Sequence, residues 1–444
     1  MDNRNNTKSD IISNLPSGII DNILICLPIH EAVKTSVLSK NWRSKWRYLS
    51  KLVFDNTFYL TSKRSITTLF FNIYKVLLLH HGPISNFTFH VQLLGDYPEI
   101  NQLFLYLSEK NVQEISFDAG GDYQYGTYRL PSYLFSCVTL RRLTLFSCSF
   151  KVPLAFQGFV KLIYLEFQWV NYNINVFETF ISKCPLLETL SIKECDNTCN
   201  LDIDLPNLRF FEFSRYFESI CFRKPCRHLS TVIFDGHFVR HAFESTRFFE
   251  SLHVVEYLRL GREFVNCLRD GIMPRKFSLG CLRVLELPDI RFWCSNEVSV
   301  VLCLIVSSPN LEKLEIGSFA PCYYNKLESL APQLLKVEDL LENALKKLRV
   351  VKMKMEYIKE IKAELDFIKF LLAESVALEK MFIQPHTKTV AEEGLEILKE
   401  ITQFQCSSNK AEIVCIDPDD DDDSEDSSDD DSGSGEGSNY GSEG

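Results

Sequence analysis

The segments LRRLTL (residues 140–145), LIYLEF (residues 162–167) and LETLSI (residues 187–192) share one pattern of apolar residues, and this pattern decides the fold. Each segment reads apolar-x-x-apolar-x-apolar. The last two apolar positions lie two residues apart, so both point to the same face of a short strand. The pattern occurs twelve times, with copies that begin at Ile84, Val112, Leu140, Leu162, Leu187, Leu208, Leu229, Val255, Leu282, Leu311, Leu348 and Leu378.

The spacing of these copies predicts a solenoid. Successive copies start 21 to 30 residues apart, except for a gap of 37 residues between Leu311 and Leu348. A period of about 20 to 29 residues is typical of leucine-rich repeats. Because one repeat cannot bury its apolar face alone, stacked repeats form a curved solenoid with a parallel sheet on the concave side. We therefore predict an α/β fold with repeats over residues 56–341 and a boundary near residue 342.

The charge of the chain is unevenly distributed. The 444 residues are 45% apolar and carry a net charge of -11, which argues against a nucleic-acid-binding protein. Residues 417–444, however, contain ten Asp, three Glu and no Lys or Arg. Removing these thirteen acids leaves 46 acidic against 48 basic residues, so the body of the protein has a net charge of +2. We expect residues 417–444 to form a disordered acidic tail, because so polar a segment cannot form a core.

Three roles for this tail stay open. The three roles are a solvating segment, a binding site for a basic partner and a substrate of an acid-directed kinase. The kinase hypothesis names Ser427 and Ser428, because each is followed by Asp three residues later.

The sequence predicts a nuclear or cytoplasmic protein. The first ten residues lack the apolar segment of a signal peptide. The longest apolar stretch, Val298–Val306, is far shorter than the roughly 20 residues of a membrane span. The fifteen cysteines are therefore expected to be reduced thiols.

No motif of a common enzyme class is present, since Walker, GxGxxG, HExxH and GxSxG patterns are all missing from the sequence. A zinc site is an alternative interpretation of Cys195, Cys199, Cys221, Cys226, His228, His237 and His241. No second cysteine pair stands at zinc-finger spacing. The repeat itself places five cysteines at fixed positions: Cys137, Cys148, Cys184, Cys195 and Cys226. We predict no metal, cofactor or catalytic residue.

Residues 10–55 differ from the repeats and predict three short helices. Pro16 suits the first turn of a helix that carries an apolar stripe and ends before Pro28. A second short helix follows, and a third is expected to open after Ser39, with Trp42 and Trp46 on one face. So small a unit cannot bury all its apolar area within itself, and its composition is typical of a protein-binding hot spot.

Basic residues in the same segment leave DNA contact as an alternative. They surround two tryptophans instead of lining a polar recognition face, which favours a solvated rim. These residues are Lys40, Arg43, Lys45 and Arg47.

Residues 10–55 closely resemble the F-box of plant proteins. The matching elements are Leu15-Pro16, Leu27-Pro28, Ala32-Val33, Thr35-Ser36-Val37-Leu38-Ser39-Lys40, Trp42-Arg43, Trp46 and Leu52-Val53-Phe54-Asp55. The resemblance implies binding to the Skp-family adaptor of a cullin-RING ubiquitin ligase. It also implies an adaptor-facing surface formed by Leu15, Pro16, Ile19, Ile20, Ile23, Leu27, Val33, Val37, Leu38 and Trp42. Trp46 has a second interpretation, in which it packs towards the first repeat.

Residues 342–416 resemble the FBD domain that follows F-box and leucine-rich repeats in a large plant family. The matching stretches are LRVVKMKM (348–355), LDFIKFLLAESVALEKMFI (365–383), a helix expected near residues 392–404 and a strand AEIVCI (411–416). The predicted organisation is a flexible N-terminus (1–9), an F-box (10–55), a leucine-rich-repeat solenoid (56–341), an FBD domain that caps the solenoid (342–416) and the acidic tail (417–444).

This organisation predicts a non-catalytic substrate receptor. The resemblance implies that the F-box docks on an SCF-type (Skp-cullin-F-box) ligase while the repeats hold an unknown target protein, with neither nucleic acid nor membrane as a partner. The target surface is expected on the concave sheet, at Arg142, Phe146, Tyr164, Phe210, Tyr257, Arg259, Lys313 and Lys352. A repeat scaffold that assembles no ligase is the alternative. An enzyme is the least favoured class, because the sequence nominates no convergent polar pocket.

Overall fold

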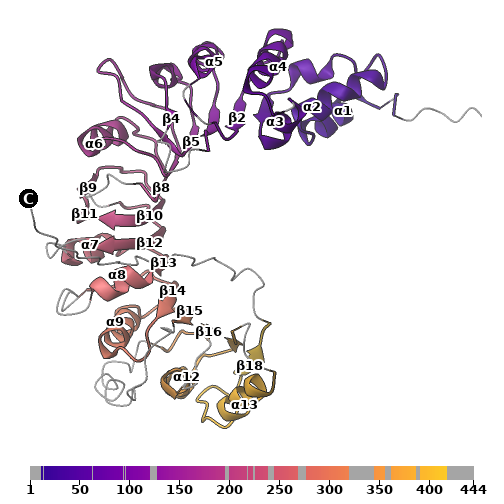
Figure 1. Ribbon diagram of the computed structural model, residues 1–444. Helices are drawn as coiled ribbons and strands as arrows, with labels where there is room; N and C mark the ends of the chain where they lie inside the picture. The colour runs from indigo at the N-terminus through magenta and orange to yellow at the C-terminus, as the bar shows by residue number, and fades with distance from the viewer. Residues whose placement is uncertain are drawn as a thin grey trace, which may run out of the picture.

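The chain forms a curved solenoid with a small helical module at its N-terminal end (Figure 1). The computed structural model describes residues 12–417, apart from a few isolated positions and the segments 121–127, 196–199, 239–244, 269–276, 320–344, 356–361 and 387–390. The repeats follow an arc, and the helical module and the last strand lie at its two ends.

Within the described residues, a continuous sheet of fourteen parallel strands lines the concave side of the arc. Its strands in order are β1 (Lys51–Phe54), β2 (Asn86–His90), β3 (Glu114–Asp118), β5 (Arg142–Phe146), β7 (Tyr164–Gln168), β8 (Thr189–Lys193), β10 (Phe210–Phe217), β12 (Thr231–Phe238), β13 (Tyr257–Leu260), β14 (Val284–Ile290), β15 (Lys313–Ser318), β16 (Val350–Lys354), β17 (Lys380–Gln384) and β18 (Glu412–Cys415). The twelve predicted copies correspond to the strands from β2 to β17. Leu143 pairs with Leu165, and Leu165 pairs with Leu190, so the repeats stack in one register. The predicted parallel sheet is confirmed.

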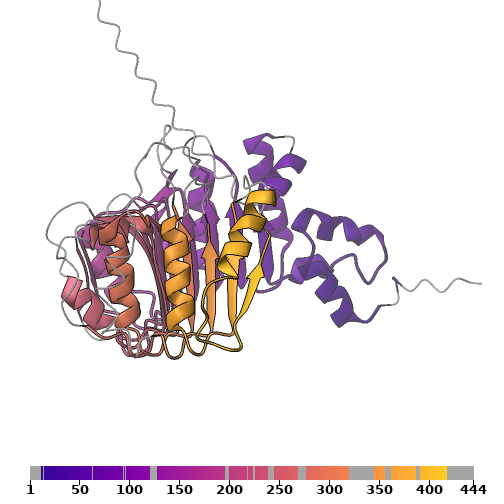
Figure 2. The ribbon, with the colours of Figure 1, turned by 90° about the horizontal axis from the view of Figure 1, so that it is seen from below.

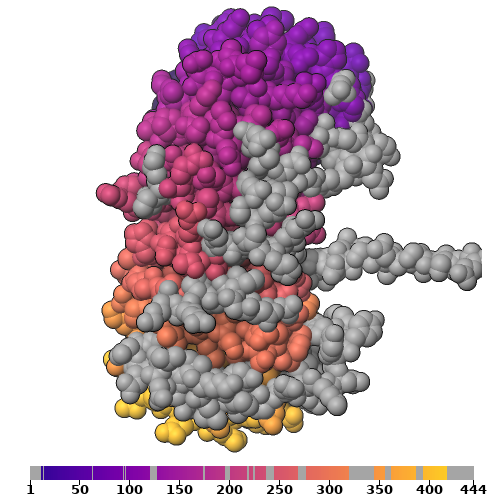
Figure 3. Space-filling model, turned by 90° about the vertical axis from the view of Figure 1, so that its left-hand side faces the viewer, coloured from indigo at the N-terminus to yellow at the C-terminus, as the bar shows by residue number. Residues whose placement is uncertain are grey.

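The convex side carries helices and short irregular segments (Figure 2). Figure 3 shows the repeats following one another in chain order along one face of the molecule. The helices are α4 (Ile66–Leu79), α5 (Pro98–Ser108), α6 (Ile174–Ser182), α7 (Ser245–Ser251), α8 (Arg262–Cys267), α9 (Ser295–Val306), α12 (Lys362–Glu374) and α13 (Ala391–Ile401). The 3-10 helix η3 (Ser132–Ser136) and two short sheets complete this side: β4 (Tyr128–Arg129) with β6 (Cys148–Ser149), and β9 (Asn200–Ile203) with β11 (Ser219–Phe222). In the described part of the chain, none of the helices has the length and apolar character of a membrane span.

Phenylalanine fills much of the space between the sheet and the convex segments. Phe89 and Phe117 of neighbouring strands stack with their ring centroids 5.5 Å apart. Phe135 of η3 packs edge-on against Phe156 at 5.2 Å and lies parallel to Phe159 at 6.1 Å. Each ring closes the gap between one repeat and the next, so the core is continuous along the arc.

The N-terminal module (residues 12–55) contains α1 (Ser17–Ile25), α2 (Ile29–Lys34) and the 3-10 helices η1 (Thr35–Val37) and η2 (Lys45–Tyr48). The prediction of a third helix opening after Ser39 was wrong, because residues 40–44 form successive turns. The Ser39 hydroxyl accepts a hydrogen bond from the Asn41 amide at 3.2 Å, which stabilises a tight turn. Trp42 and Trp46 are nevertheless both buried. Burial of the two indoles therefore explains their presence without an α-helix.

Strand β1 joins the N-terminal module to the solenoid. It contains Leu52 and Phe54, which end the stretch that resembles an F-box, and it pairs with β2 along its whole length. Helix α3 (Asn56–Thr61) follows directly, with the Asp55 carboxylate accepting from the Phe58 amide at 3.0 Å as an N-cap. The module and the first repeat thus share one strand.

The sheet of the solenoid continues through the C-terminal strands β16, β17 and β18. Helix α12 lies between β16 and β17, and α13 lies between β17 and β18. Among the described strands, β18 pairs only with β17 and so forms the edge of the sheet. The last described residues, Ile416 and Asp417, come directly after this edge strand.

Candidate functional site

Exposed apolar side chains gather on the N-terminal module. Val37 is 87% exposed, Ile19 is 48% exposed and Leu38 is 47% exposed, although all three are aliphatic. Ile23 and Pro16 of the predicted adaptor surface are exposed as well. Leu15, Leu27 and Val33 are partly buried and pack against the core of the module. Exposed apolar clusters of this kind mark protein-binding surfaces.

Two residues of the predicted adaptor surface lie inside the module. Ile20 is 1% exposed and Trp42 is 3% exposed, so neither contributes to the accessible surface. The Trp42 indole donates a hydrogen bond to the Ile12 carbonyl at 3.0 Å, and the Asn41 side chain donates to the Ser13 carbonyl at 3.1 Å. Trp42 therefore holds the segment before α1 in place. An adaptor would contact it only after a rearrangement of the module.

Trp46 lies at the junction with the first repeat. Together with Val33 of α2 and Val76 of α4, it lines a cavity of about 230 Å³ between the module and the solenoid. The interpretation that Trp46 packs towards the first repeat is therefore supported. His30 lines the same cavity, and its buried Nδ1 has no hydrogen-bond partner among the residues that the structure describes.

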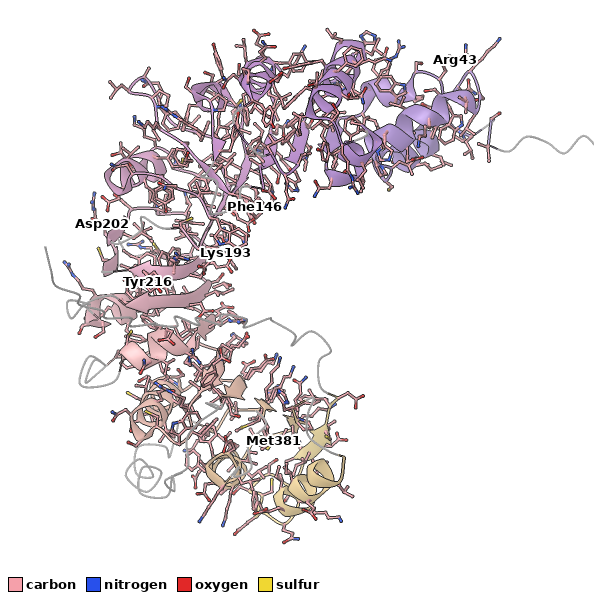
Figure 4. All side chains as sticks on the ribbon, viewed as in Figure 1. Arg43, Phe146, Lys193, Asp202, Tyr216 and Met381 are labelled. Atoms are coloured by element: carbon pink, nitrogen blue, oxygen red, sulfur yellow. The ribbon has the colours of Figure 1, made fainter. Side chains whose placement is uncertain are left out.

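Charged and aromatic side chains on β5 to β10 form a first cluster on the concave face. Lys193 Nζ lies 3.0 Å from a Glu166 carboxylate oxygen and 3.5 Å from one of Glu212. The Tyr164 hydroxyl donates to Glu166 at 2.7 Å, and the Arg142 guanidinium lies 3.9 Å above the Tyr164 ring centroid. Figure 4 shows Lys193 and Phe146 on the concave side of the sheet, whereas Asp202 and Tyr216 lie towards its outer side.

This first cluster changes the acid–base properties of its members. Burial, followed by the hydrogen bond to Glu166, raises the pKa of Tyr164 to about 12. Burial lowers the pKa of Lys193, but the Glu166 and Glu212 carboxylates outweigh burial and hold it above its ordinary value. Near neutral pH the tyrosine is therefore a neutral donor and the lysine is a cation.

A second cluster lies on β13 to β15. The Tyr257 hydroxyl donates to the Glu286 carboxylate, and Arg259 Nη1 lies 3.0 Å from the same carboxylate. Burial, with the contact to Glu286, raises the pKa of Tyr257. Lys313 forms an ion pair with Glu315 on its own strand. Both clusters therefore present cations that are neutralised by neighbouring carboxylates.

The eight predicted target-binding residues all lie on the concave face but do not form one site. Arg142 and Tyr164 belong to the first cluster, whereas Tyr257, Arg259 and Lys313 belong to the second. Phe146, Phe210 and Lys352 are half-buried on separate strands. The sequence prediction missed Lys193. Lys193 directly follows the buried Ile192 in β8, and this alternation along the strand could have placed its side chain on the concave face.

Comparison with known proteins identifies the family. A family model described as the F-box domain matches residues 12–54, and one described as the LRR repeats of the FBD-associated F-box protein At5g56370 matches residues 100–316. The F-box/FBD/LRR-repeat protein At1g13570 of Arabidopsis thaliana is 35% identical over 321 residues, which cover 70% of this chain and 76% of that protein. This chain belongs to the F-box/FBD/LRR-repeat family.

Two further relatives from the same plant support the assignment. The FBD-associated F-box protein At5g56370 is 30% identical over 212 residues, which cover 46% of this chain and 48% of that protein. The putative FBD-associated F-box protein At1g55030 is 28% identical over 249 residues, which cover 49% and 57% of the two chains. The N-terminal module is therefore the F-box.

The repeat cysteines of this F-box/FBD/LRR-repeat protein have a structural role. All five are buried, and burial raises the pKa of the Cys137 and Cys184 thiols to about 12. Among the residues that the structure describes, no three potential metal ligands cluster. Several of the predicted positions lie outside the described residues: Cys199 and His241 of the alternative zinc interpretation, and the candidate phosphorylation sites Ser427 and Ser428.

Proposed function

We propose that the protein is a non-catalytic substrate receptor of an SCF-type ubiquitin ligase. The observation that carries the proposal is the exposed apolar surface of the F-box, formed by Pro16, Ile19, Ile23, Val37 and Leu38. Exposing such a surface to water is unfavourable unless a partner covers it, and burying each aliphatic side chain yields about 1.5–3 kcal/mol. The partner proposed for this surface is a Skp-family adaptor, which connects the receptor to the cullin.

The proposed adaptor site is tested by capture of a recombinant plant Skp-family adaptor on the immobilised full-length protein. We expect Ile23→Asp/Val37→Asp to weaken capture at least about 100-fold, because each substitution places a charge in the apolar interface. Both positions are exposed in the structure, so the fold should be retained. The matched control is Leu154→Asp, which introduces the same charge at a fully exposed leucine outside the F-box.

Two outcomes would contradict the adaptor proposal. Either the wild type captures no adaptor, or the double variant and the Leu154→Asp control capture it equally well. The first outcome would favour a leucine-rich-repeat scaffold that binds partners without assembling a ligase. The second would place the adaptor site on another surface of the protein.

We further propose that the target protein binds the concave face. Its paired cations and half-buried aromatic residues suit a protein partner, because protein–protein interfaces combine aromatic and Arg anchors with polar rims. The Ile23→Asp/Val37→Asp protein should not bind the adaptor, so its targets should no longer be degraded. Proximity labelling with this variant should therefore enrich them. Arg142→Glu/Arg259→Glu should remove these proteins from the labelled set, whereas Lys161→Glu, an exposed control, should not. A labelled set that is unchanged by the concave substitutions would place the target site elsewhere.

A further inference from the structure

The cavity between the F-box and the first repeat has mostly apolar walls. Its apolar residues come from both sides of the junction: Val33 and Trp46 of the F-box, Phe58 of α3, and Val76 and Leu79 of α4. Trp46 and Phe58 are each 4% exposed, so two buried aromatic side chains contribute to its wall. Leu79 is 36% exposed, so the cavity reaches solvent beside α4. We call it the junction cavity.

The junction cavity has room for one aromatic ring. Its volume is about 230 Å³. An apolar cavity of about 150 Å³ is large enough to bind benzene, so the remaining space accommodates a small substituent on the ring. An aromatic ligand suits these walls, because contacts between aromatic rings add to the free energy gained by burial.

One buried atom at the junction cavity lacks a hydrogen-bond partner. His30 Nδ1 is buried without a partner among the described residues, whereas His30 Nε2 lies 3.4 Å from a Glu31 carboxylate oxygen. A carboxylate beside Nε2 favours the neutral tautomer with its proton on Nε2, which leaves Nδ1 as an acceptor. A buried acceptor without a partner is unfavourable. A ligand that donates to Nδ1 would remove this cost.

The other polar side chains of the junction cavity restrict the charge of such a donor. The Thr61 hydroxyl already uses its hydrogen in a bond to the Phe58 carbonyl at 2.6 Å. The Asn72 side chain donates to the Ser62 hydroxyl at 3.0 Å, which fixes its position. Lys75 also lines the cavity, and none of the described lining residues is acidic, so a positively charged ligand is disfavoured. The donor is therefore a neutral group.

A hydroxyl group is the neutral donor that fits these neighbours best. It can donate to His30 Nδ1 and can also accept from a donor such as Lys75 or Asn72, which an N–H group cannot do. We propose that the junction cavity binds a small neutral phenol, with its ring against Trp46 and Phe58 and its hydroxyl donating to His30 Nδ1. Such a ligand would contact the F-box and the first repeat together and would stabilise the junction.

The phenol site is separate from the surface proposed for the adaptor. None of the five residues that form that surface lines the junction cavity: Pro16, Ile19, Ile23, Val37 and Leu38. The phenol site therefore does not rest on the ligase proposal. Because its tests do not measure adaptor capture, failure of the phenol site is distinguishable from failure of the ligase proposal.

The first test compares three fluorinated probes in fluorine NMR titrations of the full-length protein. para-Fluorophenol carries the hydroxyl donor, para-fluoroanisole carries a methyl ether in its place, and fluorobenzene carries neither group. We expect para-fluorophenol to bind with a Kd on the order of 100 µM, as suits a ligand of so few atoms. The other two probes should bind about tenfold more weakly, because neither can donate to Nδ1. Equal affinities, or no binding of para-fluorophenol, would overturn the proposal.

Substitutions of His30 test the acceptor. His30→Leu removes Nδ1 and should weaken binding of para-fluorophenol about tenfold, while binding of fluorobenzene is retained. His30→Asn places an amide oxygen near the position of Nδ1 and should restore most of the affinity. His253→Leu, at an exposed histidine of another repeat, is the matched control. The proposal fails if His30→Leu binds para-fluorophenol as tightly as the wild type does.

Val76→Phe tests the cavity independently of His30. Val76 is 8% exposed and lines the cavity, so the larger side chain should fill the space and prevent binding of all three probes. The midpoint of urea unfolding shows whether each variant keeps its fold. Undiminished binding of para-fluorophenol to a folded Val76→Phe protein would place the binding site elsewhere and overturn the proposal.

A competition experiment distinguishes a free phenol from a tyrosine side chain of a partner protein, which carries the same group. para-Cresol and N-acetyl-tyrosine amide each compete with bound para-fluorophenol. We expect para-cresol to be at least about tenfold more potent, because the cavity has room for little more than one substituted ring. Equal or greater potency of the tyrosine amide would contradict a free ligand and favour a tyrosine of a partner protein.

Discussion

Gly158 is a position where the backbone of one repeat tolerates no side chain. Its φ is +114°, and a Cβ built on it would lie 2.3 Å from the Lys183 carbonyl oxygen of the next repeat. We expect Gly158→Ala to destabilise the protein by about 1–3 kcal/mol, because backbone strain and a steric clash combine. The midpoint of urea unfolding measures this loss.

Substitutions at two other glycines distinguish the stability cost of backbone strain from the cost of a steric clash. Gly95 has a φ of +125°, but no atom of the described residues lies within 4 Å of a Cβ built on it, so Gly95→Ala should show the conformational cost alone. Gly18 in α1 also has open space and has no positive φ, so Gly18→Ala should be neutral or slightly stabilising. A Gly158→Ala protein as stable as Gly18→Ala would show that the repeats adjust freely at this contact.

Single residues were predicted with mixed success. The positions that repeat along the chain, such as Leu165 and Leu190, were placed correctly because burial on a strand follows a period of two. On the F-box, Ile19 and Ile20 are adjacent in sequence, yet one is exposed and the other is buried. Family resemblance named both, because it identifies the module and not the orientation of each side chain.

Helix α12 buries a carboxylic acid. Glu364 is 2% exposed, and burial, opposed by hydrogen bonds that include one with Ser318, raises its pKa to about 7. An unfolded chain would ionise this group near pH 4.5. Between these two pH values the folded state binds more protons than the unfolded state, so Glu364 makes stability fall as the pH rises from about 4.5 to 7 and adds no further change above that range.

We expect Glu364→Gln to be more stable than the wild type at pH 8, by up to roughly 3 kcal/mol, and to match it more closely at pH 5. Thermal unfolding at both pH values measures the difference. Glu374→Gln, at an exposed position of the same helix, is the matched control and should change stability little at either pH. A stabilisation by Glu364→Gln that is equal at pH 5 and pH 8 would contradict ionisation as its cause.

Helices and strands were predictable where apolar residues recur at a regular spacing within a short segment. The twelve strands, α12, α13 and β18 all lie where the apolar pattern or the resemblance placed them. The expected helix around Trp42 was wrong because two buried indoles four residues apart fit turns as well as a helix. The small sheet of β9 and β11 has no signal of its own, since it depends on contacts between neighbouring convex segments.

The F-box and β18, the last described strand, lie at opposite ends of the arc (Figure 1). We therefore expect truncation after Ile416 to leave adaptor capture unchanged, as measured by the pull-down described above. Truncation after His386, which also removes α13 and β18, should instead expose β17 as a new sheet edge and reduce solubility. Loss of adaptor capture by the first truncation, with a normal unfolding midpoint, would mean that the tail contributes to the F-box surface.

At the scale of the whole molecule, the class of fold and the order of its parts were predictable from the sequence. A solenoid needs only contacts between neighbouring repeats, and the same pattern specifies each of them. The charge clusters of the concave face were harder to predict from the sequence. The pairing of Lys193 with Glu166 and Glu212 joins three strands, and it becomes visible only once their register is known.

The shared strand β1 opposes rotation of the F-box about the solenoid. Its four residues pair with β2, and the amides of His81 and Gly82 donate to the Arg47 carbonyl at 2.8 Å and 3.1 Å. In a ligase, the number of repeats between the adaptor and a bound target would then fix the distance between them, at about 4.8 Å per strand. A flexible linker, by contrast, would allow a range of distances. The target lysines that accept ubiquitin would change if one repeat were inserted or deleted.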